Sequence, residues 1–295
     1  MVKKYPRIVA LSRLIRLPNL LIIVITQSLV RWVLMDPLLG IKGLSLQTSP
    51  ATFVLLMLAC VLITAGGYVI NDYFDRKIDS VNDPEEVIVG NAISLRHTMA
   101  LHLVLTALGI VLGFYVAYRI GYFFLGVLFL LGAGILWFYS TTYKRQLLVG
   151  NLIVALLTAA VPMLVLFFEL PQLYRAYGGT LVSGDGLTYL VLWVGCFAGF
   201  AFLLTLAREI IKDAEDIRGD TSYGRRTLPA VAGMRISKAM VIGLFGITAA
   251  ALVLICLFYL PDRYTFTYIL VMLLVPLAVT GVLLEGPPRR GHFIR

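Results

Sequence analysis

The chain has 295 residues, of which 60% are hydrophobic and only 14% are charged, and its mean hydropathy is +0.91. Soluble domains carry about a quarter charged residues, so this composition excludes an ordinary soluble globule. The formal net charge of +9 comes from 25 Lys and Arg against 16 Asp and Glu. Because charges are so scarce, their positions along the chain are the first indication of function.

Eight apolar stretches are long enough to cross a hydrocarbon core of about 30 Å. In chain order they lie near residues 15–35, 51–70, 98–118, 121–139, 149–168, 187–206, 239–260 and 264–284. The expected fold is therefore an all-α, polytopic membrane helix bundle with eight transmembrane helices and both termini on one side. We expect no secretory signal peptide, because the first apolar run is too long and no cleavage site stands out.

The basic residues predict the orientation of this bundle. Twenty of the 25 Lys and Arg fall on the side of the termini, four fall in the opposite loops, and Arg31 lies within the first span. Of the acidic residues, 12 are on the side of the termini and four, including Glu169, are assigned to the opposite side. By the positive-inside rule, we expect both termini and the polar chemistry on the cytoplasmic side. The partners expected of such a face include anionic membrane lipid, and no nucleic acid.

The cysteine and histidine residues do not suggest a metal or redox centre. Cys60, Cys196 and Cys256 fall in apolar spans, without metal-ligand spacing, and are expected to be small buried hydrophobes. His97 and His102 are also far from the third histidine, His292, so zinc ligation is not expected.

A first acidic cluster follows the second span. On a continued ideal helix, Asn71, Asp72, Asp75 and Asp79 project at about 0°, 100°, 40° and 80°, which puts them on one face. Three carboxylates on one face repel each other, and carboxylates at the end of a membrane helix are costly to dehydrate. We therefore expect cations at this face.

A second acidic cluster follows the sixth span. Relative to Glu209, Asp213, Asp216 and Asp220 project at about 40°, −20° and 20° on an ideal helix, and Gly219 is a candidate helix end. Each cluster thus follows the second span of a set of four. This pattern predicts one membrane domain over residues 1–295, built of two pseudo-repeated four-helix halves of about 1–145 and 146–295.

Carboxylates without His or Cys favour Mg²⁺ over zinc, and Mg²⁺ in proteins is commonly shared with substrate phosphates. The two clusters therefore suggest a diphosphate bridged to the protein through metal. Cations on the same side could hold phosphate directly, namely Arg16, Lys144, Arg145, Arg225 and Arg226. The alternatives are that the acids are solvated charges paired with neighbouring Lys and Arg, and that the cations anchor the protein to anionic lipid.

At these positions the sequence resembles the UbiA superfamily of intramembrane prenyltransferases. The first cluster matches that family's NDxxDxxxD motif, and the second resembles its KDxEDxxGD form, which here contains Lys212, Asp213, Glu215, Asp216, Gly219 and Asp220. Tyr139 to Arg145 is similar to the Tyr- and Lys-containing segment after the family's fourth helix. Arg16 with Asn19 resembles the Arg-x-x-Asn of its first helix.

The resemblance implies an enzyme that transfers a polyprenyl group from a polyprenyl diphosphate to a lipophilic acceptor, with Mg²⁺ as cofactor. The metal ligands it implies are Asp72, Asp75, Asp79, Asp213, Asp216 and Asp220. Of these, Asp72, Asp75, Asp213 and Asp216 are expected to be catalytic, together with Lys144. The residues expected to bind substrate are Arg16, Asn19, Asn71, Tyr139, Tyr143, Arg145 and Lys212.

The sequence departs from the family pattern in two places. Where many members have Asn-x-Pro-x-Arg, this chain has an acid, Glu86, in place of the Arg, so that a phosphate contact is missing or comes from Arg96. The family usually has nine helices, and the ninth would begin near residue 291.

The motif form most resembles the branch that joins geranylgeranyl diphosphate to geranylgeranylglyceryl phosphate. An aromatic quinone precursor is the alternative acceptor. Two alternatives of another class are a non-catalytic lipid-binding protein and a secondary transporter. Transport is less favoured because the acids cluster at one membrane face, whereas transport sites tend to lie near the midplane. We expect the mid-span regions of this chain to lack ionisable residues.

Overall fold

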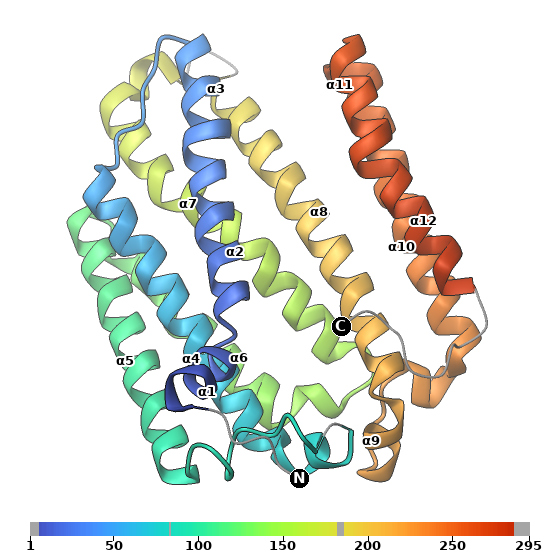
Figure 1. Cartoon of the computed structure of the whole chain (residues 1–295). Helices are drawn as coiled ribbons and strands as arrows, with labels where there is room; N and C mark the ends of the chain where they lie inside the picture. Colours follow the sequence, from blue (N-terminus) through green and yellow to red (C-terminus); the bar gives the residue numbers. More distant parts are fainter. Residues whose placement is uncertain (1–5, 83, 182–185, 286–295) are drawn as a thin grey trace. The chain divides into compact units, whose positions relative to one another are not determined.

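The computed structural model describes residues 6–82, 84–181 and 186–285 of the chain, and these residues are almost entirely helical (Figure 1). They contain eight helices that are long and apolar enough to span a membrane, from Leu17–Ile41 to Arg263–Leu284. The all-α membrane bundle and its eight spans are therefore confirmed. The position expected for a ninth helix lies outside the described residues.

The helices before the first acidic motif are α1 (Arg7–Leu14), α2 (Leu17–Ser28), a π-helical segment η1 (Leu29–Met35) and α3 (Asp36–Ile41). The middle of the chain forms α4 (Pro50–Asn82), α5 (Leu95–Arg119), η2 (Phe123–Gly126), α6 (Val127–Thr141), η3 (Tyr143–Arg145) and α7 (Val149–Leu181). The remainder forms α8 (Gly186–Glu215), α9 (Ile217–Ser222), α10 (Leu228–Tyr259), α11 (Arg263–Tyr268), η4 (Ile269–Leu274) and α12 (Val275–Glu285).

Several helices continue beyond the apolar stretches that predicted them. The second predicted span stops at residue 70, but α4 continues to Asn82, and the sixth stops at residue 206, but α8 continues to Glu215. Hydropathy detects only the part of a helix that lies in hydrocarbon, whereas backbone hydrogen bonding carries the helix on through polar residues. As a result, both acidic motifs begin on helices.

Internal contacts divide the chain into two compact units, here called unit 1 (Met1–Lys144 with Leu156–Gly199) and unit 2 (Arg145–Ala155 with Phe200–Arg295). The arrangement of the chain as two pseudo-repeated halves stays a prediction.

In unit 1, α4 is the central helix and packs against α1, α2, α5 and α6 (Figure 1). Two glycines allow α4 and α5 to approach closely. A Cβ atom on Gly66 would lie 2.4 Å from Oγ1 of Thr106, and one on Gly109 would lie 3.0 Å from the backbone nitrogen of Ile63. Small residues are the usual means by which membrane helices reach close packing.

Unit 1 also holds an ion pair buried between η1 and α7. Arg31 Nη1 donates to Glu169 Oε2 at 3.0 Å, and the two side chains are only 3% and 1% exposed. Glu169 also accepts from the backbone nitrogen of Thr48 at 3.0 Å, and Arg31 donates to the carbonyl oxygen of Thr48. The assignment of Glu169 to an outer loop was therefore wrong, because Glu169 lies within α7. The expectation of mid-span regions without ionisable residues was also wrong, because Arg31 lies near the middle of the candidate span Leu17–Ile41.

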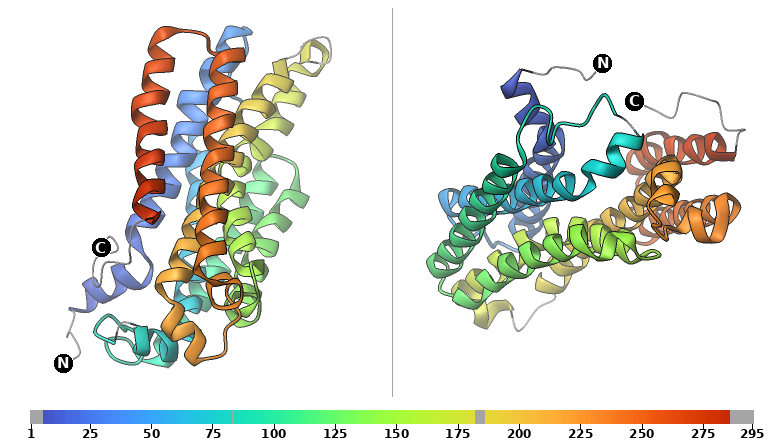
Figure 2. Two further views of the ribbon diagram at one scale, coloured as in Figure 1. Left: turned by 90° about the vertical axis from the view of Figure 1, so that its right-hand side faces the viewer. Right: turned by 90° about the horizontal axis from the view of Figure 1, so that it is seen from below.

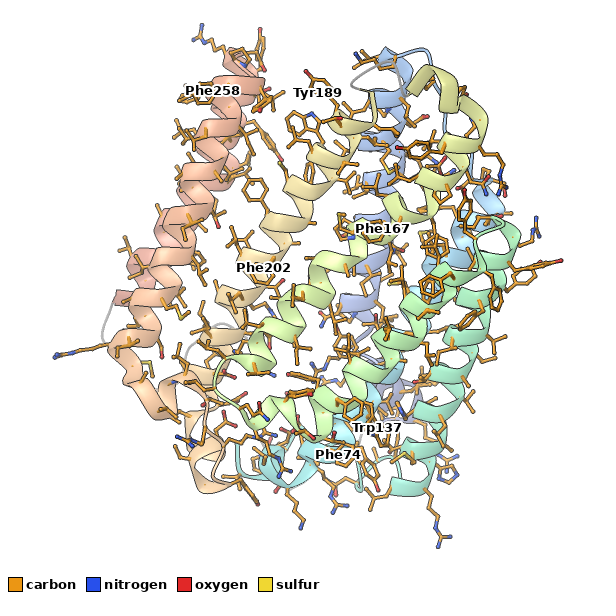
Figure 3. All side chains as sticks on the ribbon, turned by 180° about the vertical axis from the view of Figure 1, so that it is seen from behind. Phe74, Trp137, Phe167, Tyr189, Phe202 and Phe258 are labelled. Carbon is orange, nitrogen blue, oxygen red and sulfur yellow. The ribbon has the colours of Figure 1, made fainter. Side chains whose placement is uncertain are left out.

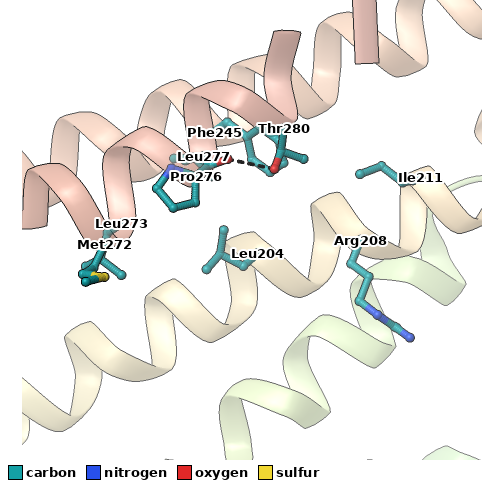
Figure 4. Close-up of a pocket in the computed structure, with 9 residues that line it drawn as sticks. All are labelled: Leu204, Arg208, Ile211, Phe245, Met272, Leu273, Pro276, Leu277 and Thr280. Atoms are coloured by element: carbon teal, nitrogen blue, oxygen red, sulfur yellow. Dashed lines mark hydrogen bonds between the residues drawn. The ribbon is translucent and has the colours of Figure 1, made fainter. Parts of the chain in front are cut away.

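In unit 2, α10 and α12 run side by side, as the orange and red helices of Figure 2 show. The described part of this unit includes an open cavity of about 410 Å³ beside α8 (Figure 4). Its wall is apolar except at Arg208 and Thr280, and the apolar lining residues are Leu204, Ile211, Phe245, Met272, Leu273, Pro276 and Leu277. The cavity therefore has a mainly apolar surface, and one of its lining residues, Ile211, precedes Asp213 by two residues in the sequence.

Candidate functional site

Arg16 lies at the junction between α1 and α2 and contacts the first acidic motif. Its backbone is left-handed, with φ of 53°, which turns the chain just before α2 begins at Leu17. Arg16 Nη2 donates to Asp72 Oδ1 at 2.9 Å, and the guanidinium lies 4.9 Å from the centre of the Tyr68 ring. Burial alone would lower the pKa of Arg16. The charge of Asp72, its hydrogen bond and the neighbouring Tyr68 and Tyr139 together outweigh burial, so the pKa is raised and Arg16 stays protonated.

Lys144 follows α6 and reaches the same face of α4. Its Nζ donates to Asn71 Oδ1 at 2.9 Å and also to the carboxylate of Asp75. The Lys144 and Asp75 side chains are only 13% and 5% exposed. Lys144 Nζ also lies 5.9 Å from the centre of the Tyr139 ring. The cations expected beside the first acidic motif are therefore present.

Aromatic contacts fix the end of α6 that leads to Lys144. Trp137 points toward Phe74 of α4, with ring centres 6.0 Å apart (Figure 3). Trp137 also packs against His102 of α5, with ring centres 5.5 Å apart. His102 Nδ1 in turn lies 2.9 Å from the carbonyl oxygen of Gly66. These contacts give His102 a structural place in the packing of α4, α5 and α6.

Tyr68 also belongs to the residues around the first acidic motif, although it was not among the expected site residues. Asn19 Nδ2 donates to the Tyr68 hydroxyl at 3.4 Å, at the far end of hydrogen-bonding distance. Tyr68 precedes Asp72 by four residues on α4, so helical spacing alone puts both on one face and could have identified it. Asp79 lies further along α4 and is half-buried.

The second acidic motif lies where α8 gives way to α9. The helix α8 ends at Glu215, Asp216 occupies the junction, and α9 begins at Ile217. The helix was expected to end at Gly219, but the interruption comes three residues earlier, at Asp216. The backbone nitrogen of Asp220 still donates to the carbonyl oxygen of Asp216 at 3.1 Å. The motif is therefore a kinked helical segment with Asp216 at the kink.

Two contacts within unit 2 hold the carboxylates on either side of the kink. Asn151 Nδ2 donates to Asp213 Oδ2 at 2.8 Å, and Arg225 Nη1 donates to Asp220 Oδ1 at 3.3 Å. Asn151 is another residue that the sequence analysis missed, because nothing in its neighbourhood along the chain connects it with a residue of α8.

Other expected site residues are more peripheral. Tyr143 is 38% exposed, Arg145 is exposed, and Lys212 is half-buried beside Asp213. The carbonyl oxygen of Arg145 accepts a hydrogen bond of 3.2 Å from the backbone nitrogen of Arg226. Glu86, the acid found in place of an Arg, lies 3.8 Å from Arg13 of α1, with both side chains about half exposed.

The donor atoms of both motifs suit a hard divalent cation. They are carboxylate oxygens, which Mg²⁺ prefers, and the first motif adds the amide oxygen of Asn71. Within the described residues, no three His, Cys, Asp or Glu side chains gather into a preformed metal cage. Mg²⁺ is usually held by one or two carboxylates together with substrate phosphates, so such a cage is not required.

The UbiA prenyltransferase family model matches residues 43–289 of the chain. A digeranylgeranylglyceryl phosphate synthase from Methanothermobacter thermautotrophicus is 33% identical over 223 residues, covering 75% of this chain and 68% of the relative. The enzyme of the same name from Thermococcus kodakarensis is 36% identical over 202 residues, covering 68% of this chain and 62% of the relative. The matches thus span about two thirds of the length of these relatives.

Two solved structures share the fold. One, described as a digeranylgeranylglyceryl phosphate synthase in membranes, gives a TM-score of 0.56 at 21% identity and covers 94% of this chain and 85% of its own. The other is a UbiA homolog from Archaeoglobus fulgidus bound to DMAPP and Mg²⁺. It gives a TM-score of 0.54 at 18% identity and covers 93% of this chain and 96% of its own. With a family model over most of the sequence and relatives above 30% identity, the chain belongs to the UbiA prenyltransferase family and is a membrane-embedded prenyltransferase.

Proposed function

We propose that this prenyltransferase transfers a geranylgeranyl or similar polyprenyl group from its diphosphate to geranylgeranylglyceryl phosphate. The proposal rests chiefly on the first motif, where Arg16 and Lys144 contact Asp72 and Asp75 on one face of α4. Carboxylates that suit a divalent cation thus lie beside cations that suit phosphate. The names of the relatives supply the acceptor class.

We propose Mg²⁺ as the cofactor and the Asp residues of both motifs as its ligands. Hard oxygen donors support this choice, and the Archaeoglobus fulgidus homolog was solved with DMAPP and Mg²⁺. Bound Mg²⁺ would stabilise the negative charge that grows on the diphosphate as it leaves. The ligands proposed are Asp72, Asp75, Asp79, Asp213, Asp216 and Asp220.

In the proposed reaction, the allylic carbon–oxygen bond of the donor breaks and diphosphate leaves with the bonding electrons. The free hydroxyl of the acceptor then attacks the allylic cation, an ether bond forms, and the hydroxyl proton is lost. Arg16 and Lys144 hold the diphosphate and stabilise its developing charge, because both are already aimed at the carboxylate face. Asn19, Asn71, Tyr139, Tyr143, Arg145 and Lys212 would contact phosphate or acceptor.

We place this chemistry on the cytoplasmic side of the membrane. The support is the distribution of Lys and Arg, with twenty on the side of the two acidic motifs and four on the other. The excess of positive charge also suits an anionic lipid surface and two anionic substrates.

The test is a panel of substrates with purified protein and Mg²⁺. Geranylgeranyl and longer diphosphates are combined with geranylgeranylglyceryl phosphate or aromatic quinone precursors, and products are read by mass spectrometry. We expect an ether product with the glyceryl phosphate, lost in Asp72→Asn and Asp213→Asn. Asp262→Asn, an exposed carboxylate that caps α11, is the matched control and should keep full turnover.

Other outcomes would overturn the proposal. If product forms with aromatic acceptors alone, the acceptor is an aromatic quinone precursor and not the glyceryl phosphate. Donor binding without product from any acceptor would indicate a lipid-binding protein. Full turnover in both Asp→Asn variants would refute the metal ligands.

A further inference from the structure

The contact between α7 and the second acidic motif lies wholly within unit 2. Asn151 is in the first turn of α7, which begins at Val149, and its side chain donates to Asp213 Oδ2 at 2.8 Å. Asn151 is 8% exposed. A buried amide needs hydrogen-bond partners, and a short contact with a carboxylate is among the stronger ones.

Packing and a backbone hydrogen bond fix the chain on both sides of Asn151 and so support this contact. Leu148, just before α7, adopts a left-handed backbone with φ of 58°, which is uncommon for a residue with a branched side chain. Leu148 and Ala155 pack in an apolar cluster with Ile210, three residues before Asp213. The hydrogen bond between Arg226 and Arg145 secures the same segment to the chain after α9. The start of α7 is therefore fixed against the end of α8 on both sides of Asn151.

The donor to Asp213 differs in charge from the donors in the first motif. Asp72 and Asp75 face Arg16 and Lys144, each of which carries a positive charge. Asn151 is neutral, so it can orient Asp213 without cancelling its negative charge. A hydrogen bond to Oδ2 also leaves Oδ1 available to another ligand.

We propose that Asn151 is a positioning residue that orients Asp213 for a divalent cation, through a hydrogen bond that does not neutralise the carboxylate. The inference rests on the proposed function, in which Asp213 is a metal ligand. Partners that orient metal ligands in this way usually change metal affinity by about 10- to 100-fold when they are removed.

The experiment measures binding of Mn²⁺ to the full chain in lipid nanodiscs, by the loss of the free-ion EPR signal, without donor or acceptor. Asn151→Leu keeps the size of the side chain and removes the donor, and we expect its Mn²⁺ affinity to fall about 10-fold. Asn151→Gln keeps an amide and should recover part of the affinity. Asn151→Lys supplies a charged donor and should bind Mn²⁺ more weakly than Asn151→Leu, because it neutralises Asp213.

Thr248→Val is the matched control, because Thr248 is buried in the same unit and donates to Leu244 of its own helix. It should leave Mn²⁺ affinity unchanged. Unaltered affinity in Asn151→Leu, when Asp213→Asn loses it, would overturn the positioning role while the proposed function stands. Unaltered affinity in Asp213→Asn would instead refute Asp213 as a metal ligand. Loss of affinity in Thr248→Val equal to that in Asn151→Leu would mean that the effect comes from general destabilisation of unit 2.

Discussion

At the first motif, basic side chains that suit phosphate lie in contact with carboxylates that suit a metal ion. Lys144 touches both the amide of Asn71 and the carboxylate of Asp75, and Arg16 touches Asp72 one turn away. A flexible ammonium group can exchange a carboxylate for a phosphate oxygen without a change of backbone. The two cations are therefore suited to bind diphosphate when it arrives at the carboxylate face.

Substitution of Lys144 tests that role. Lys144→Met removes the charge but keeps a long side chain beside the Tyr139 ring, and we expect kcat/KM for the prenyl diphosphate to fall about 10²- to 10³-fold. Lys144→Arg keeps the positive charge, so its kcat/KM should fall less than that of Lys144→Met. Steady-state kinetics with the donor varied, together with Tm, would measure the effect. A turnover within twofold of the wild-type value in Lys144→Met would contradict the assignment.

Much of the first motif could be predicted at the residue scale, and less of the second. Helical spacing alone brings Asn71, Asp72 and Asp75 together and would have added Tyr68, because all four lie on one continuous helix. The kink at Asp216 and the contact with Asn151 depend on packing between segments that are far apart in sequence. No local pattern encodes such contacts.

At the scale of elements, the packing of α4 against α5 determines where the first motif lies. Ala59, Ile63 and Gly66 of α4 face α5 at the points where glycine permits the closest approach. The eight spans were predictable, because an apolar run of about 20 residues has few alternatives to a membrane helix. Their polar continuations were not, because hydropathy does not report them.

Enlargement of Gly109 tests this interface. A Cβ atom there would lie 2.6 Å from the Ile63 side chain and 3.1 Å from the Ala59 carbonyl oxygen. We expect Gly109→Leu to lower Tm in detergent markedly, because backbone atoms cannot move aside as a flexible side chain can. Gly132→Leu on α6, where an added Cβ would meet no atom within 4 Å, is the control and should leave Tm nearly unchanged. Equal Tm values for the two variants would contradict the close approach.

At the scale of the whole molecule, one deeply buried ion pair joins two spans. Arg31 and Glu169 are only 3% and 1% exposed, lie in different candidate spans and neutralise each other. Breaking a buried ion pair by removing one partner typically costs about 3 to 5 kcal/mol, because the other charge is left uncompensated. Replacing both partners costs less.

We therefore expect Glu169→Gln and Arg31→Met each to lower the stability of the protein by about 3 kcal/mol, and the double variant to lower it by less than the sum. Thermal unfolding in detergent, analysed as a double-mutant cycle, gives the coupling directly. Additive losses would mean that the two charges do not depend on each other.

The orientation of the whole chain can be measured with single cysteines. After replacement of the three native cysteines by Ala, Cys is introduced at Ser80, near the first motif, or at Tyr264, near the start of α11; both positions are exposed. In intact cells, a membrane-impermeant maleimide should label Tyr264→Cys and leave Ser80→Cys unlabelled until the membrane is opened. The reverse pattern would place the motifs outside.

The Arg31–Glu169 pair also has a consequence for biosynthesis. Its partners are 138 residues apart, so at about 5 to 20 residues per second the ribosome makes Glu169 about 7 to 28 s after Arg31. During that interval the first span enters the bilayer with a lone arginine, which costs about 2.5 to 3.5 kcal/mol near a helix centre. The charge of Arg31 is thus neutralised only by a helix translated more than a hundred residues later, and we expect a nascent chain stalled before α7 to hold the span of Arg31 weakly.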